Sequence, residues 1–286
     1  MLALDATEVS AVVLDACRVD VQAFKPGNVS HASPGHGMRA EDFVASAEAA
    51  ATAIAQPGLT VGERILRAIE ATRFVVSFNT NLGIVLLCAP LVHAAVQSSA
   101  GRPLRPRLEG VLSALTVKDA ELAYRAIRLA RPGGLGSSAR HDVAAPPAVD
   151  LREAMREAAG RDRIASQYET VFADVFELGL PAAREFLARW QSREWAAVAV
   201  YLRFLSRFPD SLVARKFGDQ TAASVTEQAG RGAAIMESAR DPREALPALE
   251  ALDADLKRRS INPGTSADMT VATLVAMDLQ DSLERI

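Results

Sequence analysis

The stretch Val9-Ser-Ala-Val-Val-Leu-Asp-Ala-Cys-Arg-Val-Asp-Val-Gln-Ala-Phe24 repeats its apolar residues every three or four positions. This spacing places the apolar side chains along one face of an α-helix. The same period continues through most of the chain, whereas alternation at period two never runs for long. Only Phe74–Phe78 and Ile84–Leu87 have the composition of strands, and both lie in helical surroundings. The sequence therefore predicts an all-α protein of about ten to thirteen helices.

Three further stretches carry helix signals. Thr60-Val-Gly-Glu63 is a capping box, in which the threonine hydroxyl and the glutamate satisfy each other's backbone amides. Asp241-Pro242 combines an N-cap acid with proline at the first helical position, so it predicts another helix start. The range 161–178 is amphipathic, as expected for a helix with one apolar side.

Composition excludes several classes of protein. The 286 residues are 49% hydrophobic and 23% charged, as in globular domains, and the net charge of −3 gives no reason to expect a nucleic acid partner. The two cysteines, Cys17 and Cys88, are too few for a disulfide framework or a thiolate metal cage. Buried thiols in a reducing compartment are the expected alternative.

Membrane insertion is not expected either. The longest apolar run, Leu82 to Val96, is too short to span a bilayer and contains Pro90 and His93. The first ten residues lack the positive charge of a signal peptide. We therefore expect a cytoplasmic protein that binds no membrane.

The strongest break in the helical pattern is the Gly-, Pro- and Ser-rich segment 131–148. It predicts a flexible loop, and His141 within it could lie on a flap over a site. Because helical bundles tolerate long connections, we expect a single domain over residues 1–286.

Polar turns are the candidate functional segments. Lys25-Pro-Gly-Asn28 ends the first helix, and His31 and His36 follow in a flexible loop. A cation and two titratable rings suit phosphate binding or proton transfer. The same residues could simply terminate the helix, and the two histidines could instead bind a metal, although no third ligand is near.

Two more segments place polar side chains at helix starts. In Ser77–Ile84, Asn79 and Asn81 could bind an anion or a ribose hydroxyl, or Asn81 could only cap the next helix. In Ile261–Met269, Ser266 and Asp268 follow a glycine turn. Asp268 could hold Mg²⁺ together with substrate phosphates, or merely favour the helix dipole.

Charged residues on helices complete the set. Asp20, Glu48 and Asp174 stand in mostly apolar surroundings, where a buried carboxylate needs a partner or a metal and an exposed one needs neither. In the segment 209–218, Arg215 and Lys216 follow an acidic helix start and could form an anion cradle or a solvated basic face.

Together these segments resemble the triphosphoribosyl-dephospho-CoA synthase family. The match is dense in the first hundred residues and near the C-terminus, and it is carried by several motifs in the family's order. These motifs are Lys25–Asn28, His36–Met38, Asp42–Phe43, Ser46, Asn79–Ile84, Pro90–Leu91 and Asn262–Asp268.

The resemblance implies an all-α fold and a chemistry. Such enzymes use ATP and dephospho-CoA, release adenine, and join the triphosphoribosyl group to the acceptor's 2′-hydroxyl. The product is a prosthetic-group precursor. Loss of adenine from C1′ resembles glycoside cleavage, and the triphosphate needs cations or Mg²⁺ beside it.

On this basis we assign expected roles. His36 is the expected acid that protonates the departing adenine, and Asp20 and Glu48 are expected at the catalytic centre. The expected Mg²⁺ ligands are Asp268, Asp20 and Glu48. The expected substrate-binding residues are Lys25, Asn28, Asn79, Asn81, Arg215, Lys216 and Ser266.

The sequence also departs from the family. Gly37 stands where the citrate-lyase type has an aspartate, the segment 210–216 fits only loosely, and residues 141–163 do not align. These departures concern the acceptor more than the ATP site. Two alternatives therefore stay open: a related pentosyl enzyme for another cofactor, such as a methanopterin-type one-carbon carrier, and a non-catalytic helical module whose apolar faces form a homo-oligomer.

Overall fold

The computed structural model describes residues 4–97 and 101–285. These residues form fourteen α-helices with short π- and 3₁₀-helical turns and no strand, which confirms the all-α prediction and slightly exceeds the expected number of helices. The elements are α1 Ala6–Gln22, α2 Ala40–Ile54, α3 Val61–Val75, α4 Leu82–Val96, α5 Leu104–Ser113, α6 Val117–Ala130, α7 Leu151–Ala158, α8 Arg163–Thr170, η1 Asp174–Gly179, α9 Leu180–Trp190, α10 Arg193–Arg207, α11 Ser211–Phe217, α12 Asp219–Ser238, η2 Pro242–Ala245, α13 Leu246–Arg258 and α14 Gly264–Glu284.

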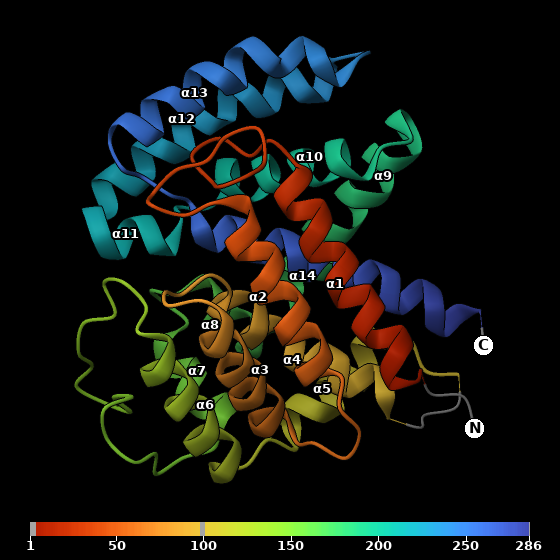
Figure 1. The fold of residues 1–286 in the computed structure, drawn as a ribbon, viewed down its shortest axis with the longest axis vertical. Helices are drawn as coiled ribbons and strands as arrows, with labels where there is room; N and C mark the ends of the chain where they lie inside the picture. The colour runs from red at the N-terminus through yellow and green to blue at the C-terminus, as the bar shows by residue number, and fades with distance from the viewer. Residues whose placement is uncertain (1–3, 98–100, 286) are drawn as a thin grey trace.

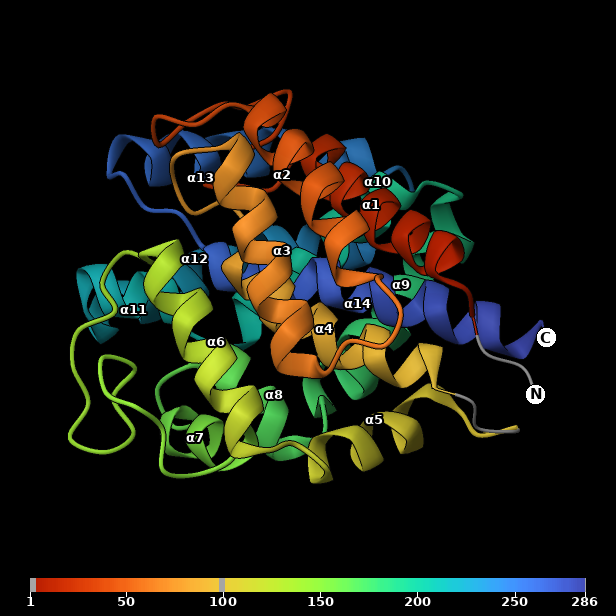
Figure 2. The ribbon, with the colours of Figure 1, turned by 60° about the horizontal axis from the view of Figure 1, so that its bottom comes forward.

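Helix α14 crosses the middle of the molecule and packs against α4, α10 and α1 (Figure 1). Helix α4 is apolar on all sides and nearly all of its residues are buried, as expected for a helix in the centre of a core. The view in Figure 2 shows α3 and α6 on one side of this central pair and the α12–α13 hairpin on another. Two helices that begin with polar turns, α4 and α14, are therefore side by side in the interior.

One of the three helix signals turns out differently from the sequence expectation. The predicted helix over 161–178 is broken, because α8 ends at Thr170 and both Val171 and Phe172 adopt positive φ angles, 54° and 55°. The Phe172 amide donates to the Gln167 carbonyl at 2.8 Å, an i−5 bond of the kind that closes a helix C-terminus. The other two helix signals are confirmed: Asp241 caps the 3₁₀ turn η2, which leads directly into α13, and the capping box at Thr60 opens α3.

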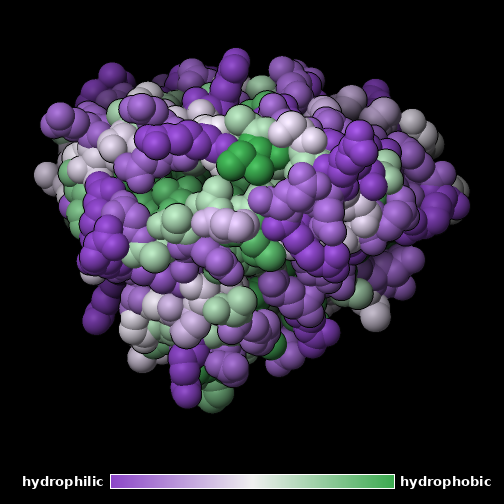
Figure 3. Space-filling view, turned by 90° about the horizontal axis from the view of Figure 1, so that it is seen from above, coloured by the Kyte–Doolittle hydropathy of each residue, from purple (hydrophilic) through white to green (hydrophobic). Residues whose placement is uncertain are grey.

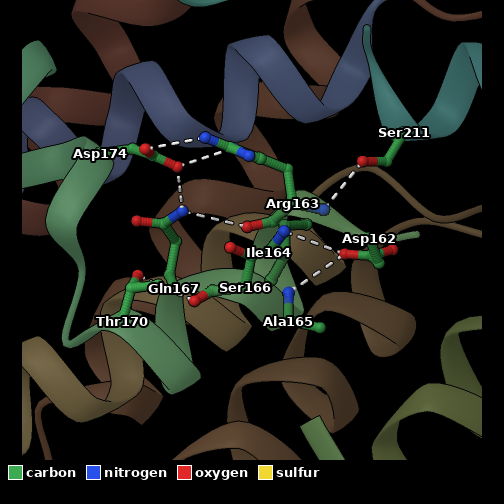
Figure 4. A network of polar contacts seen from close by, with 9 residues as sticks. All are labelled: Asp162, Arg163, Ile164, Ala165, Ser166, Gln167, Thr170, Asp174 and Ser211. Carbon is green, nitrogen blue, oxygen red and sulfur yellow. Dashed lines mark hydrogen bonds and ion pairs between the residues drawn. The ribbon is translucent and has the colours of Figure 1, made fainter. Parts of the chain in front are cut away.

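An ion-pair network fixes α8 to its neighbours (Figure 4). Arg163 forms two contacts with the Asp174 carboxylate, at 2.7 and 2.9 Å, and its guanidinium lies 3.4 Å from the centroid of the Phe208 ring. The Ser211 hydroxyl accepts the Arg163 amide at 2.8 Å. The starts of α8 and α11 are therefore held together, which matters because both contribute to the site described below.

Hydrophilic residues cover most of the face seen in Figure 3, and the hydrophobic residues that show gather near its centre. Among the described residues, no helix has the length and apolar content needed to cross a bilayer. The expectation of one domain over 1–286 stays a prediction. Positions 1–3 and 286 lie outside the described residues, and positions 1–3 belong to the N-terminal segment that was compared with a signal peptide.

Candidate functional site

A cavity of about 540 Å³ lies where the starts of α4, α8 and α14 meet α11 and the segment 131–143. Four of the residues expected from the sequence line it. They come from three segments far apart in the chain: Asn79, Arg215, Lys216 and Asp268. The convergence of remote polar turns on one niche is therefore a feature of the structure.

Asp268 is the most unusual residue of this cavity. Its carboxylate touches the place where Gly83 would carry a side chain, at the start of α4. It has no hydrogen-bond or ion-pair partner among the described residues. Burial, followed by the charges of Asp20 and Asp210, raises the pKa of Asp268 well above its usual value. A carboxylate in this setting would be stabilised by a cation delivered with the ligand.

The start of α14 is held in place by Asp210. One carboxylate oxygen accepts the Ser266 amide at 2.8 Å and the Ser266 hydroxyl at 2.9 Å. The other oxygen accepts the Leu212 and Val213 amides and so caps α11. Ser266 itself is buried and does not line the cavity. The structure thus gives Ser266 a scaffold contact, and its predicted role in substrate binding stays a prediction.

Arg215 and Lys216 stand on the α11 side of the cavity. The Arg215 guanidinium is paired with Asp162, whose other oxygen accepts the Ile164 amide at 2.9 Å and caps α8. The Lys216 amine has no carboxylate partner among the described residues, and its chain packs against Gly133. Two cations therefore line the cavity, one oriented by Asp162 and one without a carboxylate partner among the described residues.

The two asparagines of the 77–84 segment face different cavities and make different hydrogen bonds. Asn79 lines the cavity, and its side-chain oxygen accepts the Leu82 amide at 3.0 Å, so Asn79 caps α4. Asn81, which was considered as the cap, makes no capping bond and donates instead to the Thr72 hydroxyl at 2.9 Å. The Asn81 side chain faces a separate cavity of about 20 Å³ that Asp20 also lines.

Lys25 and Asp20 form a buried ion pair and do not line the larger cavity. The Lys25 amine lies 3.1 Å from the Asp20 carboxylate and also donates to the Asp20 carbonyl. The Lys25 side chain is 0% exposed. Burial lowers the pKa of Lys25, and the Asp20 charge opposes that change. The pair helps to define the turn after α1, and contact of either residue with substrate or metal stays a prediction.

We expect Lys25→Met to lower the free energy of unfolding by about 3 kcal/mol, because it leaves the buried Asp20 carboxylate without its partner. Thermal and urea unfolding measure the loss. The double variant Asp20→Asn/Lys25→Met should recover most of it, since no unpaired charge remains. If Lys25→Met were as stable as the wild type, the ion pair between Lys25 and Asp20 would not be buried in solution.

Asn28 and His36 belong to the same turn region. The Asn28 amide donates to the Asn262 side-chain oxygen at 2.9 Å, and Asn262 lines the cavity. The His36 ring lies 2.8 Å from the Gly27 carbonyl, outside the cavity lining. Asn28 is therefore one contact away from the cavity, whereas a role of His36 as the acid for adenine would need the loop to rearrange and stays a prediction.

Glu48 lies apart from the other predicted residues. Its carboxylate is 2.9 Å from Arg18, and its side chain is 53% exposed. Together they line a different surface pocket, between α1 and α2. Asp174, the third acid considered in apolar surroundings, is paired with Arg163. Metal ligation by Glu48 stays a prediction. Glu48 and Asp268 line different pockets, so this placement does not support a shared metal site.

The protein alone offers few ligands for a metal ion. No group of three or more His, Cys, Asp or Glu side chains in the described part of the chain could hold an ion. Mg²⁺ usually needs only one or two protein carboxylates when substrate phosphates supply the other ligands. The unpartnered Asp268 fits this kind of shared site, and it would hold the ion that accompanies a polyphosphate.

Sequence reasoning missed several residues of the cavity. Asp162, which orients Arg215, lies in the stretch 141–163 that could not be aligned. The role of Gly83 leaves no local signal in the sequence, because its contact with Asp268 joins residues far apart in the chain. Arg131 and Arg161 come from a loop and a helix end with no motif of their own.

A cavity with apolar walls and a few converging polar residues is typical of a small-molecule site, and the comparisons with known proteins specify the class. Residues 6–285 match the model of the ATP:dephospho-CoA triphosphoribosyl transferases, so the chain belongs to this family and is a transferase. The alternative of a non-catalytic helical module is therefore wrong.

A crystal structure from Archaeoglobus fulgidus, described as a candidate triphosphoribosyl-dephospho-CoA synthase, has a similar fold. The TM-score is 0.61 at 24% sequence identity, over 82% of this chain and 97% of that chain. No protein with a curated function matches the sequence.

Proposed function

We propose that this transferase moves the triphosphoribosyl group of ATP to the 2′-hydroxyl of 3′-dephospho-CoA and releases adenine. The family supports this reaction, and one observation supports the place where it occurs. Asn79, Arg215, Lys216 and Asp268, which the sequence singles out independently, line the same cavity.

The charges of the cavity suit ATP. A triphosphate carries about four negative charges, and two like charges about 4 Å apart repel by about 4 kcal/mol at an effective dielectric near 20. The Asp268 carboxylate could approach it only through a cation, so Asp268 would hold the Mg²⁺ of Mg·ATP, which neutralises and orients phosphate oxygens. Arg215, fixed by Asp162, would donate to phosphate directly.

The site must hold C1′ of the ribose in place and keep water away from it. Cleavage at C1′ passes through an oxocarbenium-like state, and water that reached this state would hydrolyse the sugar. The apolar walls of the cavity, which include Leu82, Leu86 and Ile164, exclude water beside the polar residues. Asn79 stands at the edge of this wall, where its amide could bind a ribose hydroxyl.

The reaction is tested by incubating the purified protein with ATP, Mg²⁺ and dephospho-CoA and measuring free adenine and the mass of the product. We expect adenine to appear only when the acceptor is present, with a product equal in mass to dephospho-CoA plus ATP minus adenine. Release of ADP in place of adenine would contradict the proposal. Release of adenine with a pterin-type acceptor but not with dephospho-CoA would assign the chain to another cofactor.

A further inference from the structure

The segment 131–143 gives the cavity a second cationic wall, which the proposed function does not use. Arg131, Arg140 and Arg161 line this side, and Lys216 approaches it from α11. A Cβ atom on Gly133 would lie 2.6 Å from the Lys216 side chain, so the segment and the lysine are in close contact.

Few of these charges are neutralised by the protein. Arg140 pairs loosely with Glu157, at 3.5 Å. Arg161 donates to the Glu157 carbonyl and to the Ser138 hydroxyl, neither of which is charged. Among the described residues, neither Arg131 nor Lys216 has a carboxylate partner. In a chain with a net charge of −3, this local excess of positive charge indicates an anionic ligand.

The segment is held in position by its own contacts. The Tyr124 hydroxyl donates to the His141 carbonyl at 2.7 Å. The Asp142 carboxylate accepts the amides of Ser138, at 2.6 Å, and Ala144, at 2.8 Å. These bonds occupy both oxygens of Asp142, which forms no ion pair with an arginine among the described residues. The cationic wall is thus a formed surface of the cavity.

We propose that Arg131, Arg161 and Lys216 bind the diphosphate of the acceptor, while Asp268 serves the triphosphate of ATP. This rests on the proposed function. Two polyanions must occupy the cavity together, and their repulsion is smallest when they bind at opposite ends. Asp268 is compatible only with the anion that brings a divalent cation, which leaves the cationic wall to the other. Apolar residues beside these cations, Leu135, Val143 and Met155, suit the pantetheine chain that follows the diphosphate.

The test is calorimetric binding of dephospho-CoA and, separately, of Mg·ATP to the whole protein. The variant is Arg131→Gln/Lys216→Gln. The control is Arg125→Gln/Arg231→Gln, which removes the same charge from exposed positions that do not line the cavity. We expect the Kd of dephospho-CoA to rise at least tenfold in the first variant only, because charge-assisted hydrogen bonds to phosphate are lost. The Kd of Mg·ATP should change less than twofold.

Two further measurements make the result specific. Adenosine, which lacks the diphosphate, should bind the wild type and the variant equally, and Arg131→Lys/Lys216→Arg should restore the affinity for dephospho-CoA. An unchanged Kd for dephospho-CoA, or an equal loss for Mg·ATP, would overturn the subsite. If the wild type releases adenine and the variant binds dephospho-CoA as tightly as the wild type, the subsite is rejected and the proposed reaction stands. If binding of dephospho-CoA depends on Arg131 and Lys216 but the wild type releases no adenine, the proposed reaction is rejected and the subsite stands.

Discussion

Asp268→Asn is expected to reduce adenine release about a thousandfold while making the protein more stable. The carboxylate lines the cavity without a partner in the described protein, so it is free to hold the cation of Mg·ATP. Loss of a metal contact to transferring or orienting phosphates removes several kcal/mol of stabilisation. Initial rates at saturating dephospho-CoA, measured over a range of Mg²⁺ concentrations, give the effect, and the concentration of Mg²⁺ needed for half-maximal rate should rise in the variant.

The gain in stability follows from the same charge. Burial and the carboxylates of Asp20 and Asp210 raise the pKa of Asp268, so the folded protein binds this proton more tightly than the unfolded chain. The ionised carboxylate therefore costs stability once the pH exceeds the unfolded pKa, about 3.9, and the cost grows until the pH passes the folded value. The Tm of Asp268→Asn should match the wild type near about pH 4 and exceed it increasingly at higher pH.

A variant that is inactive and less stable at neutral pH would contradict this account, because it would mean that the carboxylate has a protein partner. Ser266→Ala is the contrasting variant. It removes a hydroxyl that donates to Asp210, and we expect it to lower stability by about 1 kcal/mol with little change in the Mg²⁺ requirement.

The fold could be predicted from the sequence to a large extent, because helix formation leaves a local signature. The apolar period around Val13 and the capping box at Thr60 are each contained within a few residues, and both appear in the structure. The break at Val171 and Phe172 could not be predicted, because no glycine or proline marks it. Burial of the Phe172 side chain in the core, a long-range property, accompanies that backbone conformation.

The site was predicted only where turn chemistry is local. Asn79 and Asp268 lie near helix starts rich in polar residues, Arg215 lies in the last turn of the short helix α11, and these segments converge in this fold. Which face of α1 or α2 is buried depends on what packs against it. Asp20 is therefore covered and paired with Lys25, while Glu48 faces solvent beside Arg18, although the two acids have similar apolar neighbours in sequence.

Gly83→Ala is expected to cost as much activity as the loss of Asp268, about a thousandfold, through a single added methyl group. Gly83 is in the first turn of α4, where the Asp268 carboxylate occupies the space that a Cβ atom would need. The same methyl group would lie 2.7 Å from the Ile164 side chain, so neither neighbour can accept it without moving. Displacement of Asp268 should abolish the metal site, and overpacking should lower stability by about 1–3 kcal/mol.

The matched control is Gly110→Ala in α5, a helical glycine whose Cβ position is open. That substitution should leave activity unchanged and raise stability by about 0.5–1 kcal/mol, since alanine is the better helix former. In an Asp268→Ala background, Gly83→Ala should cost much less stability than in the wild type, because the carboxylate is no longer there to be displaced. Equal costs in both backgrounds would show that the glycine serves Ile164 or the helix itself, and the close approach of Gly83 to Asp268 would then have no part in forming the site.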